Sequence, residues 1–327
     1  MNSPRETGKP RYRFAEAREF LARYFKPTRM VEAPSLRKRA GQDVYLKLES
    51  ELPTGSFKVR GALYALHANL QRGKLSEVVA SSTGNHGAAV AYAAQVLGVK
   101  ARIFLPEKNN PVKREKIAQL GAEIVEEGAI DLAAAYVAAL EYARATGAFF
   151  LNDATDPDLP AGPGTIGLEI IDELPETAVI YVPMGDTALI RGVAAAAKQA
   201  SKKVRIVGVQ SRNAPSYFLS WKAGRAISTR TCDTIADGLA TRTPVPANVG
   251  AIRELVDDVI LVSEQDLLDA IAKLALEERV VAEPAGAAAT AAFLKSGEQA
   301  SPAVLLVTGA NVERSVLQRA IGTEGER

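Results

Sequence analysis

The sequence predicts an α/β protein of two domains, each with a parallel twisted sheet flanked by helices. Two observations support this prediction. Short runs rich in Val, Ile, Leu and Phe are largely apolar at every position, as in strands that a parallel sheet buries on both faces. Ala-rich segments with helical spacing separate these runs, which is the alternation of strands with crossover helices. Strands are expected over residues 44–48, 78–80, 102–105, 123–125, 149–151, 179–182, 204–209, 259–262 and 304–307, and helices over 86–97, 111–120, 130–145, 188–200, 264–277 and 285–295.

Two breaks in this alternation indicate the domain organisation. Residues 152–164 are rich in Asp, Pro and Gly, and residues 224–250 hold several Thr, Pro and Gly with little periodicity. Strands before and after the first break can form separate sheets. We therefore expect a small domain, residues 77–153, inserted into a large domain formed by residues 1–76 and 154–327. A cleft between two such domains is a common ligand site.

Composition argues against several classes of protein. The chain has 327 residues, 47% of them hydrophobic and 24% charged, as in an ordinary globular protein. A net charge of +2 gives no reason to expect nucleic acid or a membrane as partner, and no apolar run reaches the length of a membrane span. The single cysteine, Cys232, and the polar start of the chain at residues 1–6 favour the cytoplasm. One Cys and two His cannot assemble a Cys/His zinc site, and no metal is expected.

The stretch from Pro53 to Ala62 places a lysine at an unusual point. Its Pro and Gly form a turn between a strand-like run and a helical pattern, and Ser56 can cap the helix that follows. Lys58 then lies in the first helical turn, where the helix dipole disfavours a cation. A lysine amine that stays neutral is a nucleophile for carbonyl groups. The alternative is an ordinary solvated lysine, and the rest of the chain must decide between the two.

Three further loops follow strand-like runs, at the edge where parallel sheets bind ligands. Residues 81–87 lead through small residues into a helix, and their backbone N–H groups can bind an anion. The alternative is a capped turn in which His86 has only a structural role. Residues 183–189 repeat the arrangement, with Asp186 expected as a helix N-cap rather than an anion contact. Thr308 follows the last strand and can hydrogen-bond a heterocyclic nitrogen, although a threonine at a strand end is ordinary.

The stretch from Gly162 to Gly167 matches the pattern G-x-G-x-x-G of dinucleotide-binding loops. No strand leads directly into it, because residues 153–160 intervene, and it contains Pro163. The strand–turn–helix context of a nicotinamide site is therefore missing, and we expect a turn that leads into a helix. A nicotinamide-dependent dehydrogenase is the alternative that this motif would support.

Together with Lys58, these loops resemble the fold type II pyridoxal-phosphate enzymes, whose fold is like that of the tryptophan synthase β subunit. Within this family the chain looks most like the group of threonine/serine dehydratases and serine racemases. The resemblance spans most of the chain, and its blocks occur in the family's order. The matching blocks are residues 56–62, 82–87, 161–165, 235–239, 283–287 and 308–311.

This resemblance implies pyridoxal 5'-phosphate as the cofactor and a role for each matching residue. Lys58 would form a Schiff base with the cofactor and, once released, move the α-proton of the substrate. Asn85 would meet the cofactor's 3-hydroxyl group and Thr308 its pyridine nitrogen, while Phe57 and Glu283 would lie against the cofactor. A neutral hydroxyl beside the ring nitrogen leaves that nitrogen unprotonated, which suits α,β-elimination. The substrate carboxylate would lie against Ser82, Thr83, Asn85 and His86, and the cofactor phosphate against Gly185, Asp186, Thr187, Ala188 and Leu189.

The activity implied by the resemblance is that of an ammonia-lyase, which converts a β-hydroxy amino acid such as threonine or serine into a 2-oxo acid and ammonia. A homodimer is implied as well. Residues 185–189 differ from the family's Gly-Gly-Gly-Gly-Leu, so a binding protein without catalysis is an alternative if phosphate binding is lost. Gln210 and Ser216 stand where metal-binding members have carboxylates, which puts a divalent-cation site in doubt.

Thr83 keeps two further activities open. It stands where racemases place the serine that acts as acid and base on the opposite face of the substrate, so Thr83 is a second candidate catalytic residue and serine racemase an alternative. Thr83 and Thr308 also occur in threonine synthases, which keeps threonine synthase or another β-replacement activity open.

Overall fold

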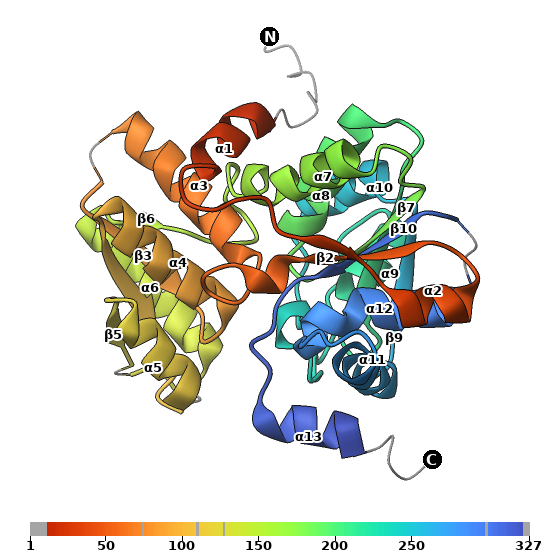
Figure 1. Cartoon of the computed structure of the whole chain (residues 1–327). Helices are drawn as coiled ribbons and strands as arrows, with labels where there is room; N and C mark the ends of the chain where they lie inside the picture. The colour runs from red at the N-terminus through yellow and green to blue at the C-terminus, as the bar shows by residue number, and fades with distance from the viewer. Residues whose placement is uncertain (1–11, 74, 109–110, 127, 298–299, 323–327) are drawn as a thin grey trace.

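The computed structural model describes residues 12–322 apart from 74, 109–110, 127 and 298–299, so the polar start at residues 1–6 lies outside the described residues. The strands form two separate sheets with helices packed against them, and Figure 1 shows these two parts side by side. This architecture confirms the predicted α/β fold of parallel sheets flanked by helices.

The larger sheet has six strands in the order β1-β2-β10-β7-β8-β9. All neighbouring pairs are parallel except the edge strand β1, which pairs antiparallel with β2. Parallel neighbours need long crossover connections, which explains the alternation of strands and helices in the sequence. The strands are β1 (Met30–Glu32), β2 (Val44–Leu48), β7 (Val179–Pro183), β8 (Arg205–Ser211), β9 (Asp258–Val262) and β10 (Ala303–Val307).

The smaller sheet has four parallel strands in the order β5-β4-β3-β6. They all come from residues 77–150, whereas the strands of the larger sheet come from before and after this segment. The expected limits of a small domain, residues 77–153, stay a prediction. The strands are β3 (Glu77–Ser81), β4 (Lys100–Phe104), β5 (Glu123–Val125) and β6 (Phe149–Phe150).

Each helix predicted from the sequence is present, with both ends within two residues of the prediction. These helices are α4 (Asn85–Leu97), α5 (Pro111–Gln119), α6 (Leu132–Thr146), α8 (Ala188–Ala200), α11 (Glu264–Leu276) and α12 (Pro284–Ser296). The other described helices are α1 (Phe14–Leu21), α2 (Pro34–Ala40), α3 (Lys58–Arg72), α7 (Ala161–Glu173), α9 (Ser216–Ala223), α10 (Pro246–Leu255), α13 (Arg314–Gly322) and two short 3-10 helices, η1 (Glu49–Glu51) and η2 (Asp237–Leu239).

Successive residues of β7 face opposite helix layers. Val179 and Tyr181 belong to the core that contains α11 and α12, whereas Ile180 and Val182 belong to the core that contains α7 and α8. Side chains alternate along a strand, so the larger sheet is buried on both faces and the strand has no polar side. The helices α7 and α8 thereby fix the loop that follows β7.

The G-x-G-x-x-G motif lies inside α7 and not in a turn before it, because α7 already begins at Ala161. Its glycines allow close contact between backbones. A Cβ atom on Gly162 would lie 2.2 Å from the carbonyl oxygen of Arg60, and one on Gly167 would lie 2.5 Å from that of Val193. The motif therefore serves the packing of α7 against α3 and α8.

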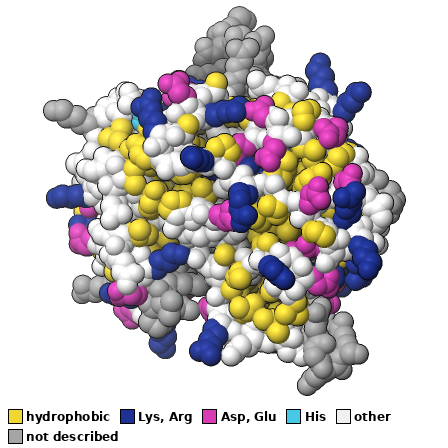
Figure 2. Space-filling view, in the orientation of Figure 1, with side chains coloured by type: hydrophobic (Ala, Val, Ile, Leu, Met, Phe, Trp, Pro, Cys, Tyr) yellow, Lys and Arg dark blue, Asp and Glu magenta, His cyan; other side chains and the backbone are white. Residues whose placement is uncertain are grey.

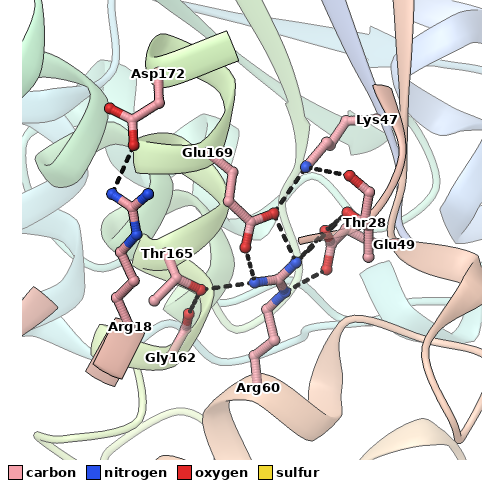
Figure 3. A network of polar contacts seen from close by, with 9 residues as sticks. All are labelled: Arg18, Thr28, Lys47, Glu49, Arg60, Gly162, Thr165, Glu169 and Asp172. Carbon is pink, nitrogen blue, oxygen red and sulfur yellow. Dashed lines mark hydrogen bonds and ion pairs between the residues drawn. The ribbon is translucent and has the colours of Figure 1, made fainter. Parts of the chain in front are cut away.

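A buried cluster of charges, centred on Arg60, joins α3 to α7 and β2 (Figure 3). The Arg60 guanidinium donates to Glu49 Oε2 at 2.7 Å and to Glu169 Oε1 at 2.5 Å. Lys47 Nζ lies 2.7 Å from Glu169 Oε2. Thr165 Oγ1 accepts a further bond from Arg60 at 2.8 Å. This Arg60 cluster holds the start of α3 in place, and Lys58 lies two residues before Arg60.

The surface carries charges of both signs. Figure 2 shows Lys and Arg side chains interspersed with Asp and Glu over the face that it presents. Within the described residues, no helix combines the length and the apolar character needed to cross a membrane.

Candidate active site

Lys58 is the first residue of α3, as the sequence predicts, but the helix is not capped by Ser56. The N-cap residue is Phe57, which makes no side-chain capping bond, and Ser56 Oγ is buried without a hydrogen-bond partner. Ser56 instead forms a β-bridge with Gly309, and Phe57 N–H donates to the carbonyl oxygen of Thr308 at 3.0 Å. These backbone contacts hold Lys58 beside the end of β10.

The amine of Lys58 contacts a carboxylate that the sequence analysis missed. Lys58 Nζ lies 2.5 Å from Asp153 Oδ2, and the two side chains are 19% and 21% exposed. Asp153 follows β6 of the smaller sheet, 95 residues later in the chain. It lies in the stretch rich in Asp, Pro and Gly, where no pattern distinguishes it from its neighbours.

Carboxylates favour the charged form of Lys58. Burial lowers the pKa of Lys58, but Asp153, Asp186 and Glu283 raise it by more, so the pKa lies above its ordinary value. Lys58 holds the pKa of Asp153 below its usual range despite burial. The helix dipole, which was expected to favour the neutral amine, is outweighed here, because full charges at short distance act more strongly than the partial charge of a helix end.

Asn85, at the start of α4, belongs to a chain of polar contacts between the two sheets. Its Nδ2 donates to Glu283 Oε1 at 2.7 Å, and its Oδ1 accepts from Asn311 Nδ2 at 2.7 Å. Lys116 of α5 donates to Asn311 Oδ1 at 2.6 Å and to the carbonyl oxygen of Thr54 at 2.9 Å. Asn311 and Lys116 were not identified as site residues from the sequence, although Asn311 ends one of the blocks that carry the family resemblance.

The loop that follows β3 ends in a helix start with uncovered backbone donors. The first N–H groups of α4, including those of Asn85 and His86, have no carbonyl partner within the helix. The His86 ring has a structural contact, since its Nε2 lies 3.0 Å from the carbonyl oxygen of Leu151 and the residue is 6% exposed. Burial lowers the pKa of His86, which favours the neutral ring. Ser82 and Thr83 lie in the same loop and are half-buried.

The loop after β7 packs closely and ends in a strained residue. A Cβ atom on Gly185 would lie 2.1 Å from the carbonyl oxygen of Gly238, so only glycine fits there. Thr187 is the N-cap of α8, has φ of 71° and makes no side-chain capping bond. Asp186 is therefore not the N-cap, contrary to the prediction. Ala188 and Leu189 begin α8.

Asp186 is a buried carboxylate close to the other acidic groups. Its Oδ1 accepts a hydrogen bond from Thr241 Oγ1 at 3.1 Å. Burial, together with the charge of Asp153, raises the pKa of Asp186 to about 6. Asp186 therefore becomes protonated at a higher pH than an ordinary aspartate.

Thr308 lies at the end of β10 and is 3% exposed. Its hydroxyl makes one long hydrogen bond, to the carbonyl oxygen of Ala285 at 3.4 Å. Glu283 is the N-cap of α12 and lies in the same corner of the molecule, because its N–H donates to the carbonyl oxygen of Gly309. The predicted residues Lys58, Phe57, Asn85, Glu283 and Thr308 are thus joined by direct or shared contacts.

Gln210 and Ser216 have structural partners. Gln210 Oε1 accepts from the N–H of Phe218 at 2.9 Å, and the Ser216 hydroxyl donates to the carbonyl oxygen of Thr241. Among the described residues, no group of three or more His, Cys, Asp or Glu side chains could hold a metal ion.

This geometry defines a class of protein. A lysine amine lies at the carboxyl ends of strands from two parallel sheets, beside two helix N-termini, a strand-end hydroxyl and several carboxylates, which is the arrangement of an α/β enzyme with a reactive lysine. The chain belongs to the family of pyridoxal-phosphate dependent enzymes, whose family model matches residues 21–309.

Characterised relatives are similar to this chain over most of its length. L-threonine ammonia-lyase of Thermotoga maritima is 37% identical over 94% of this chain and 76% of the relative. The catabolic L-threonine dehydratase TdcB of Escherichia coli K12 is 33% identical over 94% of each chain. The solved structure of threonine deaminase isoform 2 from Solanum lycopersicum has a TM-score of 0.87 at 28% identity, covering 99% of this chain and 94% of its own. Maize serine racemase has a TM-score of 0.85 at 30% identity, with 96% and 97% covered.

The residues present fit the family's cofactor, pyridoxal 5'-phosphate. An aldehyde needs an amine, which Lys58 supplies, and a phosphate needs backbone donors at a helix start, which the tightly packed loop at Gly185 supplies. Thr308 has a hydroxyl with only one long bond to protein, and Ser56 Oγ has none. The carboxylate of Asp186 opposes a phosphate, and its raised pKa weakens that opposition.

Proposed function

We propose that this protein is an ammonia-lyase that uses pyridoxal 5'-phosphate to convert L-threonine or L-serine into a 2-oxo acid and ammonia. The observation that carries the proposal is the position of Lys58 at the start of α3, where its amine contacts Asp153 and where the backbone of the preceding residue, Phe57, bonds to Thr308. Relatives named threonine ammonia-lyase or threonine dehydratase over nearly the whole chain support it. The bound cofactor supplies an electron sink that stabilises negative charge on the α-carbon.

Residues of this chain hold the substrate and move its proton in this proposal. Lys58 anchors the cofactor and, once released, takes the proton from the α-carbon. The helix start at Asn85 and His86 offers N–H groups to the substrate carboxylate, with Ser82 and Thr83 adding hydroxyls.

Cofactor contacts complete the proposed site. The residues from Gly185 to Leu189 would hold the phosphate at the start of α8, and Asn85 would meet the 3-hydroxyl group of the cofactor. Thr308 would meet the ring nitrogen, Phe57 would lie against the cofactor, and Glu283 would position Asn85 through their hydrogen bond. The single cysteine supports a cytoplasmic location, and the family resemblance supports a homodimer.

Assays of product formation test the lyase proposal. The purified protein, supplied with cofactor, is mixed with L-threonine or with L-serine, and the 2-oxo acid and ammonia are measured together. We expect equal amounts of both products. No 2-oxo acid from either substrate, nor from bulkier 3-hydroxy amino acids, would overturn the proposal.

Racemisation of serine is the second candidate, favoured by the similarity to maize serine racemase and by the hydroxyl of Thr83. In a racemase, a group on the opposite face returns the α-proton, and threonine can do so less readily than serine in that place. Chiral chromatography of an L-serine reaction distinguishes the two functions. Formation of D-serine faster than pyruvate would favour the racemase.

A further inference from the structure

Arg191 is a buried cation next to the loop that follows β7. It lies in the first turn of α8, four residues after Thr187, and is 7% exposed. Side chains of a helix lean toward its N-terminus, so a residue in this turn reaches back over the loop. The contact between Arg191 Nε and Thr187 Oγ1, at 3.2 Å, shows that it does so here.

The hydrogen bonds of Arg191 are all to neutral groups. Besides Thr187, its Nη1 donates to the hydroxyl of Tyr12 at 3.4 Å and its Nη2 to the carbonyl oxygen of Ala154 at 3.3 Å. These bonds are long and use three of the five N–H donors of a guanidinium. Within the described part of the chain, Arg191 forms no ion pair, whereas Arg60 pairs with two glutamates.

An unpaired buried cation is unfavourable, and the start of a helix is a poor place for it, because the helix dipole there is positive. Both effects would be relieved by an anion between the guanidinium and the first N–H groups of α8. Asp186 offsets this charge only in part. The charge of Arg191 lowers the pKa of Asp186, but the two side chains form no ion pair, and the carboxylate accepts from Thr241. The guanidinium of Arg191 therefore has no anion in direct contact within the described residues, and an anion at the start of α8 would supply one.

We propose that Arg191 binds the phosphate group of the cofactor at the N-terminus of α8. This inference rests on the proposed assignment of the phosphate to residues 185–189. A guanidinium matches the oxygens of a phosphate with two parallel N–H bonds, and its charge offsets the repulsion between the phosphate and Asp186. Arg191 is thus a specificity residue for the phosphorylated form of the cofactor.

The test compares pyridoxal 5'-phosphate with pyridoxal, which lacks the phosphate but offers the same aldehyde to Lys58. Equilibrium titrations of the cofactor-free full chain, followed by absorbance, give both dissociation constants. For Arg191→Gln, we expect the dissociation constant of the phosphorylated cofactor to rise roughly 10- to 100-fold, the usual loss for a charge-assisted contact. The dissociation constant of pyridoxal should change by less than about twofold, because the aldehyde site is intact.

Two further variants complete the test. Lys198→Gln removes the same charge from the far end of α8, where Lys198 pairs with Asp257, and should leave both constants unchanged. Arg191→Lys keeps the charge but lacks the paired donors. Its preference for pyridoxal 5'-phosphate over pyridoxal, taken as the ratio of the two affinities, should therefore fall several-fold. If Arg191→Gln does not fold, as judged by circular dichroism, the affinity ratio of Arg191→Lys decides the question.

The outcomes separate this inference from the proposed phosphate loop. A wild-type protein that binds both compounds equally would show that the loop does not hold the phosphate. A wild-type preference that persists unchanged in the Arg191 variants would overturn the inference alone. Equal weakening of both compounds in Arg191→Gln would also overturn it, because it would make Arg191 a purely structural residue that holds Tyr12 and Ala154.

Discussion

Two charged clusters begin on the same turn of α3 and differ in their exposure. In the Arg60 cluster, Arg60 and Lys47 face Glu49 and Glu169, so two positive charges meet two negative charges. Every one of these side chains is less than a tenth exposed. The donors and acceptors satisfy one another, and Figure 3 shows the side chains converging on the guanidinium.

The cluster around Lys58 is more open. The Lys58 amine contacts Asp153, with the charges of Asp186 and Glu283 also acting on it, and about a fifth of the Lys58 and Asp153 side chains is exposed. Burial and ionic contact alone therefore do not identify a functional site, since the Arg60 cluster has more of both. Partial access distinguishes the site that can exchange a ligand from the one that holds the fold together.

Lys58→Ala should have the largest effect and should affect only function. We expect turnover to fall by roughly 10⁴-fold or more, because both the cofactor anchor and the proton carrier are lost. Steady-state assays measure turnover, and circular dichroism with thermal unfolding checks the fold. Turnover near the wild-type rate would show that Lys58 has no catalytic role.

Arg60→Met should show the opposite pattern. Removing the Arg60 guanidinium leaves Glu49 and Glu169 buried with too little positive charge. We therefore expect the free energy of unfolding, measured in urea, to fall by about 3–5 kcal/mol. Arg29→Met is the control, because Arg29 and Glu51 form an exposed ion pair and its loss should change stability little. An Arg60 variant that unfolds like the wild-type protein would contradict a structural role for the Arg60 cluster.

Asp153→Asn tests whether the carboxylate in contact with Lys58 acts on the amine. Asp153 raises the pKa of Lys58, so the variant should have a lower Lys58 pKa, and its free-base form should be reached at lower pH. The other charged groups facing this amine, Asp186 and Glu283, remain, as does His86. We expect the acid limb of the kcat profile to move to lower pH, whereas turnover on the plateau should fall roughly 10- to 100-fold, because a base of lower pKa takes the proton less readily.

Asp158→Asn is the matched control for Asp153→Asn, because Asp158 lies nearby in the chain but pairs with Arg72. It should leave the turnover and the pH profile unchanged. An acid limb that stays in place in Asp153→Asn would exclude an effect of this carboxylate on Lys58.

Asp186→Asn should have the smallest effect and should depend on pH. The pKa of Asp186 is raised to about 6 from 3.8, so the folded protein binds more protons than the unfolded chain between about pH 4 and 6, and stability falls as pH rises through that window. An asparagine does not titrate, so the variant does not lose stability over this pH range. We expect its free energy of unfolding at pH 7 to exceed that of the wild-type protein by roughly 1–2 kcal/mol. Urea unfolding at pH 4 and pH 7 measures the difference, which should vanish at pH 4.

The sequence predicts the fold well because local patterns determine it. The apolar runs became strands and the Ala-rich segments became helices, since each pattern reflects burial between layers. The structure places Lys58 and Asn85 at helix starts and Thr308 after a strand end, where local patterns can be read, and their roles stay predictions.

The rest depends on contacts between distant parts of the chain. Asp153 reaches Lys58 across 95 residues, and nothing in its own surroundings marks it. Asp186 and Ser56 were expected to cap helices, but Thr187 and Phe57 occupy the N-cap positions because the loops must meet Gly238 and Gly309. Arg191 reads as an ordinary helix residue until its burial is known.

Thr187 has a consequence for anyone who engineers this protein for heat resistance. A threonine with φ of 71° carries about 1–3 kcal/mol of backbone strain, which glycine would avoid. The threonine hydroxyl is also a bonding partner of Arg191, and glycine cannot replace it. Thr187→Gly is therefore expected to raise the melting temperature and, at the same time, to weaken binding of the cofactor. Both properties should be measured for any substitution at this position.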